Sequence, residues 1–135
     1  MPTFTNPAAD AEEAQEALRG LAHASRMIED PTQIYRILGS VSQGLVSLTQ
    51  SLHQLGDFHD APATKRAWMS GDQREGRAAA YKVSWELHRA AEMLHQVAET
   101  INHAHEVEAT IAYDARDFPC LAPVPRSAHE PGMSL

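Results

Sequence analysis

Residues 34–56 read IYRILGSVSQGLVSLTQSLHQLG, and this stretch decides the fold class. Its large apolar side chains recur at alternating spacings of four and three residues, which is typical of a helix that packs along one side against another helix. Two glycines inside the stretch, Gly39 and Gly44, each cost a helix about 1 kcal/mol relative to alanine, and Gly56 predicts its end. The apolar seam consists of Ile34, Leu38, Val41, Leu45, Leu48, Leu52 and Leu55.

The chain before this stretch carries two helix-start signals. Asn6-Pro7 and Asp30-Pro31 each offer a capping side chain followed by a proline at the first helical position. Because the residue before a proline is biased away from helical geometry, the chain should break near residue 30. We therefore expect one helix over about 7–29 and a second over 31–56.

A third and longest helix is expected over about 72–113. Asp72 and Glu75 form a capping box at its start. The apolar positions that follow are Ala80, Val83, Leu87, Ala90, Leu94, Val97, Ile101 and Ala104. Residues 57–71 then form a linker, and the proline-rich residues 117–135 a disordered tail. No segment alternates as a strand would, so the sequence predicts an all-α fold. We expect an antiparallel helical hairpin or three-helix bundle in one domain, residues 1–116.

Composition excludes several partners and compartments. The 135 residues include 18 Asp and Glu but 11 Lys and Arg, a formal net charge of −7. This balance argues against binding nucleic acid or an anionic membrane surface. A single cysteine, Cys120, cannot form an intrachain disulfide. The N-terminus lacks the pattern of a signal peptide, and no apolar run approaches the roughly 20 residues of a membrane span, so we expect a cytoplasmic protein.

Residues 86–106, ELHRAAEMLHQVAETINHAHE, carry four of the eight histidines and one Glu-x-x-His pair. That pair is the helix motif of ferritin-like di-iron proteins, but residues 31–56 contain no Asp or Glu to complete such a site. On a helical wheel the polar stripe lies roughly 130° from the seam and is expected to face away from the core. A site for a divalent metal such as zinc and a merely solvated face both stay open. The candidate ligands are His88, Glu92, His95 and Glu99.

Two aromatic residues, Tyr81 and Trp85, lie one turn apart on the same stripe. They either pack within the chain or anchor a partner, since tyrosine and tryptophan are frequent interface hot spots. No catalytic triad, phosphate loop or glycine fingerprint is recognisable, so we expect no enzyme activity. We predict a non-catalytic interaction or assembly protein that forms a homo-oligomer, most simply a dimer. The predicted interface residues are Tyr81, Trp85, His88, Leu38, Leu45 and Leu52.

A runner-up interpretation comes from two short motifs. Trp68 and Gly71 lie between the two long predicted helices, and Tyr113 and Asp117 form a Tyr-x-x-x-Asp after the last one. In that order the motifs resemble the WXG100 and related helical-hairpin substrates of type VII secretion. The resemblance implies an exported helical hairpin that pairs as a dimer, with Tyr113 and Asp117 read by the secretion machinery.

Overall fold

The computed structural model describes residues 1–60 and 72–121, and within them it contains three α-helices and no strand. The helices are α1 (Pro7–Ala24), α2 (Gln33–Phe58) and α4 (Gln73–Glu108), and a 3₁₀ turn, η1, covers Pro119–Leu121. The predicted all-α class is confirmed. None of these helices is both long and apolar enough to cross a bilayer. Most of the predicted disordered tail, residues 122–135, lies outside the described residues.

The chain divides into two compact units, Met1–Ile34 with Ala112–Leu135 and Tyr35–Ile111. In the first unit, the Asn6 side chain caps α1 by accepting a hydrogen bond from the N–H of Ala9 (3.1 Å). The helix ends at Ala24, five residues before the predicted boundary. Ser25 caps this end, with its backbone N–H donating to the carbonyl of Leu21 (2.8 Å). Further on, Asp30 accepts hydrogen bonds from both the N–H and the hydroxyl of Thr32, which close a turn around Pro31.

The start of α1 is held by one carboxylate. Asp10 accepts hydrogen bonds from the backbone N–H groups of Thr3 (2.6 Å) and Phe4 (3.1 Å), and these bonds hold the pKa of Asp10 below its ordinary value. Because the folded-state pKa is lowered, the carboxylate stabilises this turn above the ordinary pKa of an aspartate. That contribution is lost as the pH falls through the lowered value.

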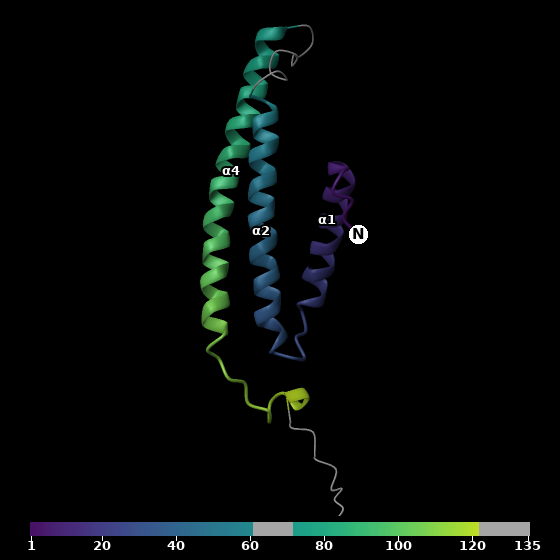
Figure 1. Cartoon of the computed structure of the whole chain (residues 1–135), viewed down its shortest axis with the longest axis vertical. Coiled ribbons are helices and arrows are strands. Elements are labelled where there is room, and N and C mark those ends of the chain that lie inside the picture. The colour runs from purple at the N-terminus through teal and green to yellow at the C-terminus, as the bar shows by residue number, and fades with distance from the viewer. Residues whose placement is uncertain (61–71, 122–135) are drawn as a thin grey trace, which may run out of the picture. The chain divides into compact units, whose positions relative to one another are not determined.

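In the second unit, α2 and α4 lie side by side and run in opposite directions (Figure 1). Two contacts fix their register. The rings of Tyr35 and His105 stack with centroids 4.0 Å apart, and the Nδ1 atoms of His53 and His88 are 2.7 Å apart. The contacts are separated by 18 residues on α2 (53 − 35) and by 17 on α4 (105 − 88). The antiparallel alignment therefore holds along this length without a slip.

Small residues form the line along which the two helices meet. On α2 the buried positions are Ser42 and Gly56, and on α4 they include Ser84, Ala91 and Ala98, which follow one another at seven-residue spacing. That spacing marks a single stripe on each helix, as in a coiled coil. In the described part of this second unit, the buried apolar side chains are alanines: Ala80, Ala91 and Ala98.

The predicted leucine seam has the right period, but part of it lies beside the contact line, since Leu48 and Leu55 are exposed. The contact line of α2 runs one residue after Val41, Leu48 and Leu55, so these side chains border the contact instead of forming it. Leu38, Leu45 and Leu52, predicted as interface residues, are half-buried. The physical reason is size, because serine, alanine and glycine let two helix backbones approach more closely than leucine does.

The helix ends also differ from the expected ones. The predicted cap of the third helix is confirmed, since the Asp72 side chain accepts hydrogen bonds from the N–H groups of Arg74 and Glu75. That helix ends at Glu108, however, and not near residue 113. The second helix continues two residues past Gly56 to Phe58, into the predicted linker. Gly56 does not end the helix but lies beneath the ring of His88.

Two glycines of α2 each lie beneath a histidine ring of α4. A Cβ added to Gly56 would lie 2.7 Å from His88 Nε2, and one added to Gly39 would lie 3.2 Å from His105 Nε2. At Gly44 a Cβ would meet nothing within 4 Å. Gly56 and Gly39 therefore make room for side chains of the facing helix, whereas no neighbouring atom requires a glycine at position 44.

This contrast predicts opposite effects of two alanine substitutions. We expect Gly44→Ala to raise the free energy of unfolding by about 0.5–1 kcal/mol, because alanine favours the helix and meets open space. Gly56→Ala should instead lower it, since the new methyl group pushes the His88 ring out of place. Urea denaturation of the two variants measures both values. Equal gains at both positions would show that His88 does not cover Gly56.

Candidate functional site

The hairpin has two sides, which follow from its antiparallel register. Residues one position before the contact line lie on the same side of the pair in both helices, and residues four positions after it lie on the opposite side. His53 and His88 are both of the second kind, and their contact agrees with this assignment. We call the first side the apolar flank; it consists of Val41, Leu48, Leu55, Val83, Ala90 and Val97. The second is the histidine side.

The apolar flank is largely open to solvent. Its exposed fractions are 44% for Leu48, 51% for Leu55, 41% for Val83 and 47% for Val97. Charge is nearly absent from this part of α2, where Arg36 is the one Lys, Arg, Asp or Glu between Gln33 and Gly56. Exposed apolar side chains that are contiguous along two helices indicate an interaction surface.

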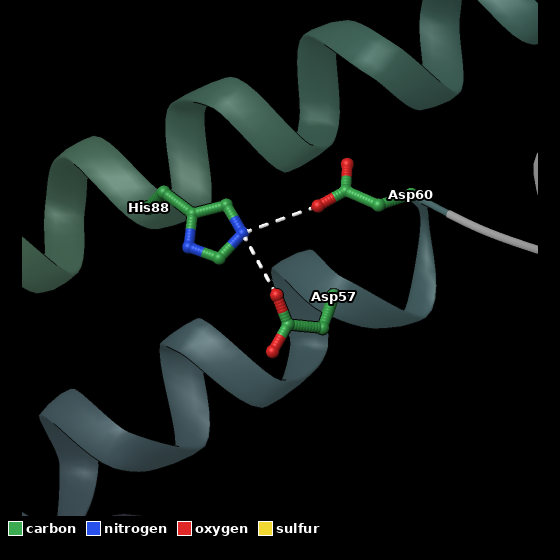
Figure 2. Close-up of side chains that lie close together, drawn as sticks. All are labelled: Asp57, Asp60 and His88. Atoms are coloured by element: carbon green, nitrogen blue, oxygen red, sulfur yellow. Dashed lines mark ion pairs between the residues drawn. The ribbon is translucent and has the colours of Figure 1, made fainter.

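On the histidine side, His88 of α4 points toward the end of α2. Its Nε2 atom lies 3.3 Å from Asp57 Oδ1 and 3.4 Å from Asp60 Oδ2. Figure 2 draws both ion pairs as dashed lines. One nitrogen of His88 and one oxygen of each aspartate all lie within 4.8 Å of one another. The imidazole is half-buried and both aspartates are exposed. These residue types at these distances can hold a divalent cation.

The other nitrogen of His88 belongs to a chain of contacts. His88 Nδ1 meets His53 Nδ1 at 2.7 Å, and His53 Nε2 lies 3.5 Å from Glu92 Oε1. His53 is half-buried, while Glu92 is exposed. The contacts therefore run from Glu92 through His53 and His88 to the two aspartates, and they join α2 to α4.

The predicted metal stripe is thus divided by the structure. His88 joins Asp57 and Asp60, Glu92 joins His53, and His95 and Glu99 form a separate exposed pair, 3.5 Å apart. The expectation that the whole stripe faces away from the neighbouring helix is wrong for His88. The reason is the displaced seam, because the true contact line runs closer to His88 than the predicted one.

Sequence reasoning missed three members of this cluster. Asp57 and Asp60 lie in the predicted linker, and His53 lies in the leucine-rich second helix, away from the histidine-rich stretch. One signal could have found two of them. If α2 is continued past Gly56, His53 and Asp57 are four residues apart and share a helix face.

The remaining predicted residues lie elsewhere. Tyr81 and Trp85 are 68% and 51% exposed on the histidine side, and the Arg89 guanidinium lies 5.3 Å from the Trp85 ring centre. In the other unit, Tyr113 follows the helix end and contacts Phe118 edge-on, with ring centroids 5.8 Å apart. The backbone N–H of Asp117 donates to the carbonyl of Asp114. Trp68 and Gly71 lie outside the described residues.

Comparisons of the chain with protein-family models, with curated proteins and with solved structures find no match. The resemblance to WXG100-like hairpins therefore stays a prediction from Trp68, Gly71, Tyr113 and Asp117.

Proposed function

We propose that this protein is a non-catalytic assembly protein whose helical hairpin pairs with a second copy of itself through the apolar flank. The observation that carries the proposal is the composition of the buried core. Across residues 1–60 and 72–121, no leucine, isoleucine, valine or aromatic side chain is buried, and the buried apolar side chains are Pro31 and three alanines, all three of them in the hairpin.

Alanines alone supply little stability to a hairpin. Burying one CH₂ group contributes about 0.8 kcal/mol to stability. A leucine that stays half-exposed therefore supplies only part of the stabilisation that its full burial would give. Helices in proteins owe most of their stability to packing of an apolar face and not to helix propensity. A partner that covers the exposed leucines and valines of the apolar flank would therefore be stabilised by the burial of their apolar surface.

A second copy fits this surface in chemistry and in size. The flank is apolar on both helices and carries no charge, so two copies related by a two-fold axis present complementary surfaces to one another. A strip as long as α2 and two helices wide measures ~39 Å by roughly 20 Å, or on the order of 800 Å². A typical specific interface buries about 800 Å² on each partner. Pairing two hairpins in this way gives a four-helix arrangement.

The mass in solution tests the proposal. Sedimentation equilibrium of the full chain should give twice the 14.8 kDa of one protomer. The melting temperature should also rise with protein concentration, because dimerisation stabilises the folded state by mass action. A monomer at every accessible concentration, with a melting temperature that does not change, would contradict self-association.

A further inference from the structure

The histidine cluster contains more contacts than two neutral imidazoles can satisfy. His53 faces Glu92 and His88, and His88 faces His53 and the aspartate pair, which makes three contacts that each need one hydrogen. A neutral imidazole carries one N–H and one lone pair. The two N–H groups can therefore donate in only two of the three contacts. In the third contact, a nitrogen lone pair faces another hydrogen-bond acceptor.

One proton arrangement leaves the unmet contact at the aspartates. If His53 Nε2–H donates to Glu92, the His53 Nδ1 lone pair accepts the Nδ1–H of His88. The lone pair of His88 Nε2 then faces Asp57 and Asp60, whose oxygens are 3.3 and 3.4 Å away. A nitrogen lone pair and two carboxylate oxygens that converge on one point form a cation site. In the part of the chain that the structure describes, no Lys or Arg pairs with either aspartate.

We propose that Asp57, Asp60 and His88 bind one divalent transition-metal ion of the Zn²⁺ or Co²⁺ type, and that His53 and Glu92 position His88 for it. The two nitrogen–oxygen distances suit such an ion, because ligands about 2.0–2.1 Å from a tetrahedral zinc are roughly 3.3–3.4 Å apart. Imidazole combined with carboxylate is a donor set that these metals accept.

Two neighbours of His88 define the position of its ring. Gly56 is buried beneath it, and a Cβ there would lie 2.7 Å from Nε2, so the ring sits where only glycine leaves room. The contact of the second ring nitrogen with His53 matches the role of outer partners in metal sites, which fix the tautomer and orientation of a ligating histidine. His53 is thus a positioning residue.

Titration of the untagged full-length protein, first dialysed against a chelator, tests the site. We expect one Co²⁺ or Zn²⁺ per chain, followed by the visible absorption of bound cobalt and by calorimetry. His88→Ala should weaken binding at least a hundredfold, and Asp57→Asn at least tenfold. His53→Ala should weaken it about 10–100-fold without moving the cobalt absorption bands, because the metal keeps its ligands.

His95→Ala provides the matched control, since His95 lies on the same helix, pairs with Glu99 and is not one of the proposed ligands. It should leave the affinity within twofold of wild type. The proposal is overturned if the wild-type chain takes up no stoichiometric metal. It is also overturned if His88→Ala binds as wild type does, or if His95→Ala loses as much affinity as His88→Ala. Circular dichroism of each variant confirms that the helices are intact. None of these outcomes bears on self-association, so the two proposals stand or fall separately.

Discussion

Replacing Leu48 and Val97 together with glutamate should turn the dimer into a monomer. The two residues lie on the apolar flank, one on each helix, and each is about half exposed in the single chain. In a dimer the double variant would bury four carboxylates without partners, and each buried unpaired charge costs several kcal/mol. We expect the dissociation constant to rise by more than a hundredfold, which corresponds to about 2.7 kcal/mol. Sedimentation equilibrium at micromolar concentration measures the change.

The matched control removes apolar area from the other side of the hairpin. Tyr81→Ala combined with Trp85→Ala deletes two larger side chains from the histidine side, and it should leave the mass at that of a dimer. The opposite result would also be informative. If the aromatic variant dissociates and the glutamate variant does not, the copies meet through Tyr81 and Trp85, as the sequence first suggested.

The second large effect is expected at Ala91, which is fully buried where α2 meets α4. Ala91→Leu adds three carbons at a position with no space for them, so the helices must separate or the new side chain must adopt a strained rotamer. Overpacking of this kind costs about 1–3 kcal/mol. Because alanine and leucine have similar helix propensities, the loss would report packing alone. Chemical denaturation, with the midpoint and slope compared with wild type, measures it.

Ala78 offers the corresponding control on the same helix. It is exposed, so Ala78→Leu should change the free energy of unfolding by no more than about 0.5 kcal/mol. If Ala91→Leu proves equally harmless, the two helices do not meet through the line of small residues, and the register described for the hairpin is wrong.

Much of the fold could be predicted from local signals, because these act within a few residues of one another. The Asn6 and Asp72 caps begin helices as expected, and the heptad period of residues 34–55 does belong to a helix that packs along one side. The line of contact could not be predicted in the same way. Periodicity gives the spacing of a stripe but not its position on the helix. Hydrophobicity favours placing the leucines in the contact line, whereas close approach of the two helices favours small residues such as Ser42 and Gly56 there.

The candidate site was harder to predict because it is assembled from two helices. His88 was recognised, but it was grouped with Glu92, His95 and Glu99, which share its helix. Its actual neighbours, His53, Asp57 and Asp60, lie between 28 and 35 residues away in the sequence. Only the register of the hairpin brings them together, and that register depends on the same contact line that the hydrophobic pattern misplaced.

The line of small residues has a consequence for how the hairpin keeps its alignment. Serines, alanines and glycines at seven-residue intervals look much the same after one helix slides by a heptad, a displacement of about 10.5 Å. Such a seam brings the backbones close but hardly distinguishes one sliding position from the next. The ring contacts, Tyr35 on His105 and His53 on His88, do distinguish them, since any slide separates both pairs at once. The two ring contacts therefore fix the register of a hairpin whose line of small residues does not specify one.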